Sequence, residues 1–466
     1  MAKSGGSTLR ELMAKFIRLY NDRNFAGCAE LSFKPKPDLP GSILETMLAQ
    51  FYRKNGDIVD YRIVKEQILG TYGFLLLDVQ YEELGAPKVI GIHAFKLDRW
   101  ALDLPGFFLF GFNKPLFSHK EQYRCFQKEL AESRMRSEAD WDKDLPGGFQ
   151  IRVLPQFELA LAALSVSNIQ DKGFLVRREK VTAYEREVND YFQRYSDHPL
   201  IVLLNSLPDQ GLVTPLLIYL VNFGEPPEMK RRFYFNFDEI WEAYFYNWID
   251  LLRSFAVQSN FMSFFDDHRS FYEDYIADIR SKTDGQDMIA FLEDYFGAKF
   301  DGYYLYLSPL ATHVVSGPVF LAKNHRRCSL LGGLHNMSKP YLEYISLIEW
   351  AHGFVGPICV QFSDEIKARS EVIMSLQEGT FYGSPYIVLE EYIIVTVGLR
   401  YVINTYSEED RKSVLDSEID FWEKERGFKQ LTSFIDLFAE FEERRDIYPT
   451  VKDFFPRIFS YLDRLF

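Results

Sequence analysis

The stretch Ile348-Glu-Trp-Ala-His-Gly-Phe-Val-Gly-Pro357 is the most informative segment of this chain of 466 residues. The apolar pattern around it predicts a helix over residues 340–355. Two histidines four residues apart on one helix can bind the same metal ion, with the glutamate that follows the first histidine as general base. Glu349 and His352 keep this spacing, but Ile348, which has no lone pair to offer a metal, stands at the first position.

The composition predicts an acidic globular chain of two or three domains, at about 100–200 residues per domain. Hydrophobic residues make up 47% of the chain, and the formal net charge is −14. This charge argues against a general nucleic-acid-binding protein, which needs clustered Lys and Arg. No apolar run reaches the roughly 18 residues of a membrane span. The four cysteines form no C-x-x-C pair, which argues against a cysteine zinc site or a redox pair.

The N-terminal sequence leaves the compartment open. Met1-Ala-Lys-Ser-Gly-Gly is not followed by the apolar region of a signal peptide. We expect a cytoplasmic protein if this N-terminus is native, and an exported one if a signal peptide was removed.

Residues 8–113 predict a small α+β domain. Apolar residues at helical spacing start at Leu9 and again at Ile43, which predicts helices within residues 8–54. Segments rich in β-branched and aromatic residues follow and predict an antiparallel meander, with strands at 61–69, 72–81, 88–97 and 106–112.

This first domain resembles the cone-shaped nuclear-transport-factor-two-like fold. The resemblance lies in the run from Phe16 to Phe33, the Leu39-Pro step and a helix that ends at Lys54-Asn-Gly, before the strands. Such domains hold small apolar ligands, dimerise or act as spacers. The resemblance therefore implies a contact surface here, with homo-oligomerisation through this domain as one form of it.

Charged residues 114–147 predict an irregular linker that ends at Leu145-Pro-Gly-Gly. Residues 148–466 predict a mostly helical domain with a small sheet, so the whole chain is assigned to the α+β class. The last helix is expected to break near Pro456. Helices are predicted at 181–195, 238–256, 261–281, 286–296, 340–355, 386–405, 418–424, 429–443 and 448–465, and short strands at 302–308 and 313–322.

Five segments in order resemble an uncharacterised bacterial family of zincin-like domains of the gluzincin type. They are Val153-Leu-Pro-Gln-Phe-Glu-Leu, His198-Pro-Leu-Ile-Val, Leu307-Ser-Pro-Leu, the decamer from Ile348 to Pro357, and the run from Glu391 to Tyr401. The resemblance covers about residues 148–405. It implies a zinc-peptidase scaffold in which Glu349 is the general base and in which His352 and Glu391 are metal ligands.

Three departures from the pattern of that family lie near the implied site. Ile348 replaces the first histidine ligand, Gly356 replaces an asparagine before Pro357, and Val395 stands where an arginine is usual. Together these changes predict a pseudoenzyme. Glu349, His352 and Glu391 would then be vestigial, and no cofactor would be bound.

Other interpretations remain open at this point. An active metallohydrolase would hold zinc through His352, Glu391 and an unconventional ligand such as His335, because catalytic zinc usually has three protein ligands. Alternatively, His352 is a hydrogen-bonded core histidine and Glu349 a buried carboxyl paired with Arg400.

The cluster Asp266-Asp267-His268 has the composition of a metal or acid–base site, but its amphipathic setting favours a solvated helix face. The short basic clusters at residues 230–232 and 325–327 favour solvated loops.

The leading functional hypothesis is a catalytically inactive zincin-like protein that binds a protein or peptide through its former cleft. The rival is an active zinc metallopeptidase. A weaker third hypothesis is the binding of a small apolar ligand in the cone of the first domain.

Overall fold

The computed structural model describes residues 8–31, 48–49, 51–70, 72–83, 87–96, 100–102, 117, 120–135, 147–171, 176, 182–205, 213–232, 239–283, 285–311, 315–317, 326–332, 337–378 and 382–465. The chain divides into two compact units. The first comprises Met1–Arg134 with Phe237–Asp250, and the second comprises Met135–Asn236 with Leu251–Phe466.

The division at Arg134 falls inside the segment 114–147, but the expectation of irregular structure there was wrong. Helix α5 (Lys120–Arg134) occupies much of it. Its buried residues Tyr123, Phe126 and Leu130 form a narrow apolar stripe at helical spacing among charged neighbours. This stripe is too sparse to stand out in the sequence.

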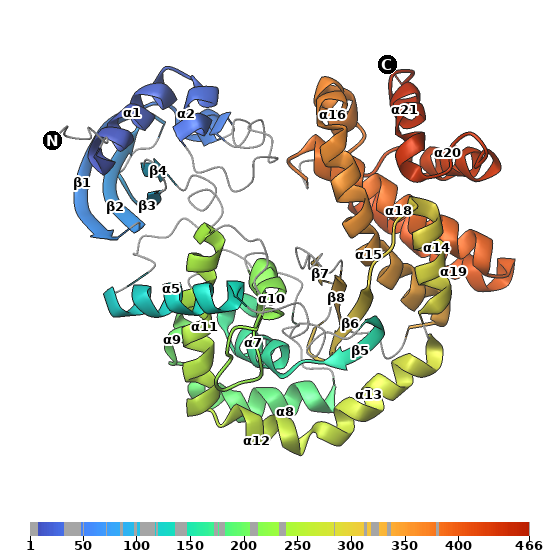
Figure 1. Ribbon diagram of the computed structural model, residues 1–466, viewed down its shortest axis with the longest axis horizontal. Helices are drawn as coiled ribbons and strands as arrows, with labels where there is room; N and C mark the ends of the chain where they lie inside the picture. The colour runs from blue at the N-terminus through green and yellow to red at the C-terminus, as the bar shows by residue number, and fades with distance from the viewer. Residues whose placement is uncertain are drawn as a thin grey trace. The chain divides into compact units, whose positions relative to one another are not determined.

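The first unit combines helices with an antiparallel sheet (Figure 1). Helices α1 (Leu9–Asn21) and α2 (Phe25–Leu31) precede strands β1 (Ile58–Leu69), β2 (Tyr72–Tyr81), β3 (Lys88–Lys96) and β4 (Trp100–Leu102), which pair in chain order. The first three predicted strands are confirmed. The short β4 was not expected, and the strand predicted at 106–112 lies outside the described residues.

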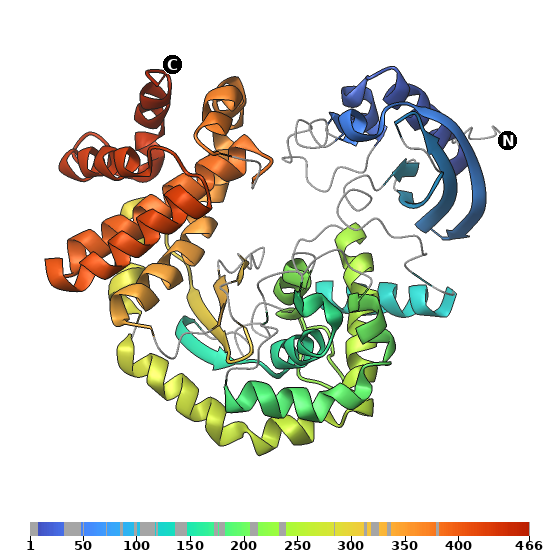
Figure 2. The same cartoon turned by 180° about the vertical axis from the view of Figure 1, so that it is seen from behind.

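The core of the first unit lies between α1 and the concave face of this sheet, whose curvature Figure 2 shows. Leu75, Leu77 and Val79 alternate along β2 and point toward the apolar face of α1. Irregular pairing near Ile58 and again near Ile63 adds curvature to β1, as bulges do.

The first part of the second unit is built from short helices around one strand. Pro155 opens α7 directly after β5, and all residues of α7 are buried. The predicted helix at 261–281 is divided at His268. The elements are β5 (Gly148–Val153), α7 (Pro155–Ser165), α8 (Ala183–Phe192), α9 (Pro199–Asn205), α10 (Thr214–Leu220), α11 (Glu239–Gln258, whose residues to Asp250 belong to the first unit), α12 (Phe261–Asp267), α13 (Arg269–Lys282) and α14 (Gln286–Phe296).

A mixed sheet forms the centre of the second unit, in the order β5-β6-β8-β7. Strands β5, β6 (Gly302–Ser308) and β8 (Arg326–Gly332) are parallel, and the edge strand β7 (Val315–Gly317) is antiparallel to β8. Every residue of β6 is buried, as expected for a strand covered on both faces. β8 was missed, because its opening Arg326-Arg327 was assigned to a solvated loop.

Helices of varied length follow the sheet. They are α15 (Lys339–Gln361), α16 (Ser363–Ala368), α17 (Ser370–Ser375), α18 (Pro385–Thr405), α19 (Glu408–Asp420), the π-helical turn η5 (Phe421–Glu425), α20 (Leu431–Glu443) and α21 (Val451–Leu462). Of the helices described, α15 and α18 are the longest. The expected break near Pro456 was wrong, because Pro456 lies inside α21. A capping box at Thr450 and a buried phenylalanine-rich face hold that helix together around the proline.

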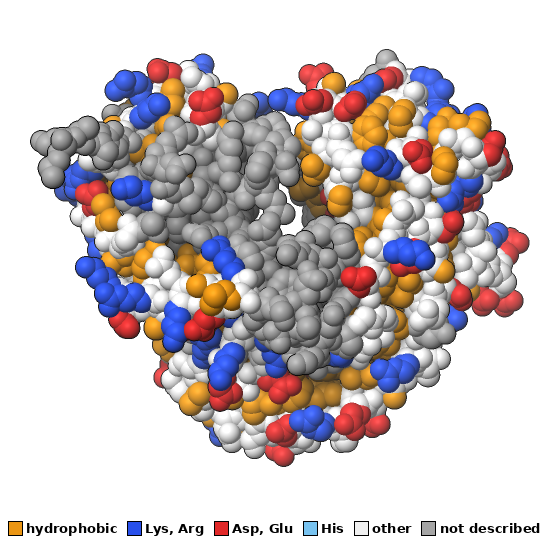
Figure 3. Space-filling model, viewed as in Figure 1, with side chains coloured by type: hydrophobic (Ala, Val, Ile, Leu, Met, Phe, Trp, Pro, Cys, Tyr) orange, Lys and Arg blue, Asp and Glu red, His pale blue; other side chains and the backbone are white. Residues whose placement is uncertain are grey.

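The observed architecture confirms the α+β class. Among the described residues, no helix combines the length and the apolar character that a membrane crossing requires. On the face shown in Figure 3, acidic and basic side chains are interspersed over the described surface.

Candidate functional site

The decamer lies on α15, which pairs with α18 in antiparallel orientation. His352 contacts Glu390, Ile348 contacts the position of Gly398, and Glu343 contacts Tyr401. Partner numbers on α18 therefore rise as the numbers on α15 fall. Both helices are almost wholly apolar along their buried faces, so burial of those faces accounts for the pairing.

Ile348 occupies the first position of the motif as a packing residue. An ideal Cβ placed on Gly398 would lie 2.4 Å from Cγ2 of Ile348 and 2.9 Å from ring carbons of Tyr344. Gly398 therefore lets the two helices approach closely at Ile348, and a larger residue would force them apart. The position that a first histidine ligand would occupy is a buried apolar contact.

His352 lies between two carboxylates of α18. Its Nδ1 is 2.9 Å from Oε1 of Glu390, and its Nε2 is 3.9 Å from Oε1 of Glu391. The side chains of His352, Glu390 and Glu391 are 20%, 21% and 12% exposed, so the cluster is partly open to solvent. Burial opposes a charge on His352, but the hydrogen bond with Glu390 and the neighbouring carboxylates outweigh it and raise the pKa of His352 to about 9.

Glu349 lies one turn before His352 and belongs to the same cluster. Burial raises the pKa of Glu349 to about 8; the positive charge of His352 lowers it, and the charge of Glu391 raises it further. Near neutral pH this arrangement favours a neutral Glu349 beside a protonated His352. The positive charge of His352 then balances the negative charge of a neighbouring carboxylate of α18.

Two side chains that the sequence did not single out also reach Glu391. Burial raises the pKa of Glu391, whereas the positive charges of His352 and Arg426 and a hydrogen bond with Tyr382 lower it. Arg426 directly follows the π-helical turn η5, a kind of element that often occurs at functional sites. No local sequence signal indicates either residue, because only tertiary contacts bring Tyr382 and Arg426 close to Glu391.

A tight backbone contact supports the segment that carries Arg426. The amide of Glu378 donates to the carbonyl of Gly427 at 2.7 Å. Gly427 has φ +71°, and a Cβ there would lie 2.4 Å from the carbonyl oxygen of Glu378. Glycine is therefore required for the close approach of these two loops.

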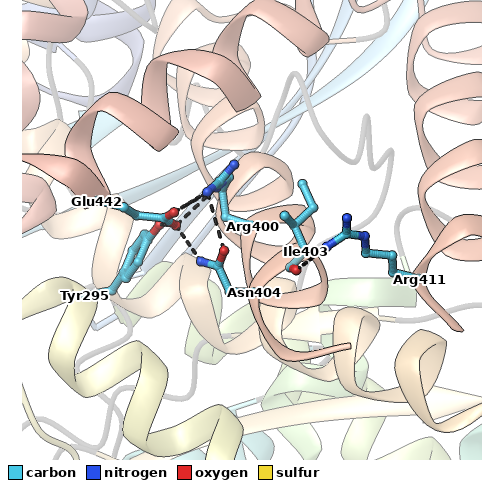
Figure 4. A network of polar contacts seen from close by, with 6 residues as sticks. All are labelled: Tyr295, Arg400, Ile403, Asn404, Arg411 and Glu442. Atoms are coloured by element: carbon cyan, nitrogen blue, oxygen red, sulfur yellow. Dashed lines mark hydrogen bonds and ion pairs between the residues drawn. The ribbon is translucent and has the colours of Figure 1, made fainter. Parts of the chain in front are cut away.

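Arg400 is not the partner of Glu349, so that expectation was wrong. Figure 4 shows its guanidinium directed at Glu442 of α20, with Tyr295 and Asn404 around the same carboxylate. The Arg400 Nε atom is 3.1 Å from each oxygen of Glu442, and Nη2 forms a further, short contact. Arg400 thus connects α18 to α20, away from the cluster around His352.

Glu343 is a second carboxylate on α15, fully buried and hydrogen-bonded. It accepts hydrogen bonds from the hydroxyl groups of Thr283, Tyr401 and Tyr406, the first two at 2.8 Å. These contacts satisfy the hydrogen-bonding capacity of the buried carboxyl group and connect three separate segments of the second unit. Glu343 therefore has a structural role.

Of the remaining candidates, Asp266-Asp267-His268 does not form a joint site. His268 Nε2 is 2.8 Å from Glu187 of α8, while Asp266 pairs with the neighbouring Arg269. His335 lies outside the described residues. Gly356 is in tight contact with Glu390, since a Cβ there would lie 3.3 Å from Oε1, and Val395 is buried in the core.

Two of the short motifs have local structural roles. The His198 Nδ1 accepts the amide of Leu200 at 3.1 Å, so the ring caps the first turn of α9. The Ser308 hydroxyl accepts the amide of Leu310 at 3.2 Å and ends strand β6 in a turn.

The residues present do not fit a catalytic zinc site. Two ligands held about 2.0–2.1 Å from a tetrahedral zinc lie about 3.3 Å apart, which is close to the His352–Glu391 separation of 3.9 Å. Among the described residues, however, a third donor is missing, because Ile348 occupies its position. Within the described parts of the chain, no group of three or more His, Cys, Asp or Glu side chains is arranged to hold a metal ion.

Comparison with known proteins gives one match. Residues 239–461 match a family model described as a domain of unknown function (DUF4932). The match extends from α11 to α21 and includes Ile348, Glu349, His352 and Glu391. No curated protein and no solved structure matches the chain.

Proposed function

We propose that this chain is a degenerate zincin-like protein, a pseudopeptidase, that binds a protein or peptide through its second unit. The observation that carries the proposal is the close packing of Ile348 against Gly398, at the position where the motif requires a metal ligand. The hydrogen bond between His352 and Glu390 adds to it, because it raises the pKa of His352 and a metal would have to displace a proton from this ring.

The edge of the mixed sheet supports a peptide as the bound partner. Among the described residues, no strand pairs with the outer edge of β7, and such an edge can accept an extended peptide as an added strand. Helix α15, which carries His352, contacts both β7 and β8. The motif helix and the edge strand β7 therefore belong to one part of the second unit.

The metal half of the proposal is tested by elemental mass spectrometry of the purified full chain, prepared without added zinc or chelator. We expect no stoichiometric zinc. About one zinc per chain in the native protein, abolished in His352→Ala, would overturn the proposal in favour of an active metallopeptidase with an unconventional ligand.

The binding half is tested with a random library of peptides about ten residues long, a length that would span a strand of this size. We expect peptides to be retained uncut and to slow amide exchange in β7 and β8. Cleaved peptides would contradict the inactive site, and protection confined to other elements would contradict the binding edge.

A further inference from the structure

Glu158 is a carboxyl group buried in the second unit, away from the cluster on α15. It lies in the first turn of α7, and the residue is 1% exposed. The Tyr184 hydroxyl of α8 donates to its Oε2 at 2.7 Å, and the hydroxyl of Tyr272, on α13, lies 2.5 Å from that of Tyr184. Three helices thus meet at one acid.

Among the described residues, the groups that face Glu158 include no Lys or Arg. Ser308 approaches from the end of β6, Tyr184 from α8 and Tyr272 from α13. His268, at the junction of α12 and α13, adds a favourable charge when protonated, but its ring is hydrogen-bonded to Glu187. Among the described residues, no Lys or Arg forms an ion pair with Glu158. A charge on this carboxyl is therefore poorly compensated.

We propose that Glu158 is a proton-responsive switch: its neutral form allows α7 to pack closely against α8 and β6, and its ionisation loosens that packing. The switch uses residues from four elements of the second unit. It is independent of the function proposed for the cluster on α15, since Glu158 shares no contact with that cluster.

The direction of the switch follows from linkage. Burial raises the pKa of Glu158 to about 7, although Ser308, Tyr184 and His268 oppose this shift. The folded state therefore binds the proton more tightly than the unfolded state does, where the pKa is about 4.3. The stabilising contribution is complete below about pH 4 and is lost as the pH rises to about 7, which changes the opening equilibrium on the order of a hundredfold.

The test is amide hydrogen exchange by mass spectrometry of the full chain at about pH 5 and about pH 8, corrected for the intrinsic exchange rate. In the native protein, we expect exchange in α7, α8 and β6 to accelerate on the order of a hundredfold at the higher pH. Glu158→Gln, which keeps an oxygen that can accept from Tyr184, should remove this acceleration. The matched control Glu371→Gln, an exposed glutamate of α17, should leave it unchanged.

Equal acceleration in native protein and Glu158→Gln would overturn the proposal. Because the Glu158 variant can fail to fold, infrared spectroscopy of Glu349→Gln, in which Glu349 no longer contributes a carboxyl band and Glu158 is intact, gives a second measurement. A protonated carboxyl band lost between about pH 5 and pH 8 in step with the exchange is expected, and its absence at about pH 5 would also overturn the proposal.

Discussion

Gly398→Ala tests the contact that closes the first ligand position. The new methyl would lie 2.4 Å from Ile348 Cγ2 and 2.9 Å from the Tyr344 ring, both of which are buried. Overpacking a core costs about 1–3 kcal/mol, and the short separation places this case at the upper end. Alanine recovers about 1 kcal/mol of helix propensity. We therefore expect a net loss of about 2 kcal/mol in the free energy of unfolding.

A double-mutant cycle with Ile348→Ala, followed by urea unfolding of all four proteins, isolates the contact. Ile348→Ala alone should cost about 2–5 kcal/mol, because it leaves a cavity. In the Ile348→Ala background, Gly398→Ala should lower the free energy of unfolding by about half as much as it does in the native protein, since only the clash with Tyr344 remains. Gly383→Ala, where a Cβ meets nothing within 4 Å, is the control and should cost close to nothing. Additive losses, within about 0.5 kcal/mol, would show that Ile348 does not lie against Gly398 and would refute the steric argument.

Further predictions concern the same helix pair. Glu343→Ala should lower the free energy of unfolding by about 3–5 kcal/mol in urea, because three buried hydroxyl donors lose their acceptor; Glu343→Gln should lose less. Arg400→Lys should lose nearly as much stability as Arg400→Ala in the same assay, because lysine cannot reproduce the forked contact with its carboxylate. The His352 ring should titrate near pH 9 by NMR, with its stabilising contribution complete below about pH 6.5 and lost as the pH rises through about 9; Glu390→Gln should lower this midpoint. Ile348→His should reduce stability and bind well under one zinc per chain by elemental analysis, since the new ring must leave its contact with α18 to reach a metal.

The sequence predicted the elements whose pattern is strong and local. The first three strands of the meander follow from runs of β-branched and aromatic residues, and the helix at 286–296 follows from helical periodicity; these elements are confirmed. Helix α5 was missed because its sequence is rich in charged residues, and strand β8 because it opens with two arginines, although tertiary packing determines the structure of both. The same limit applies to Pro456, where burial of an apolar helix face outweighs a local break signal.

In the candidate site too, the sequence predicted what depends on local spacing and missed what depends on tertiary contacts. Spacing placed Glu349 and His352 on one helix, and the paired acids of α18 were visible as polar residues in an apolar run. Spacing could not show that Glu390, rather than Glu391, makes the close contact with His352. Nor could it show Tyr382 or Arg426, because both depend on loops that meet only in the folded chain.

Two of the three departures from the expected motif, Ile348 and Gly356, have a common physical explanation in the structure. Ile348 packs against a glycine of α18, and Gly356 of α15 lies in tight contact with Glu390. These two contacts are eight residues apart on α15, or about 12 Å along the helix, with His352 midway between them. On each side of His352, a glycine of one helix thus leaves room for a side chain of the other helix. Because the helices are held close at both points, the apolar contact at Ile348 is a property of the whole helix pair, and a single substitution at Ile348 leaves most of that packing in place.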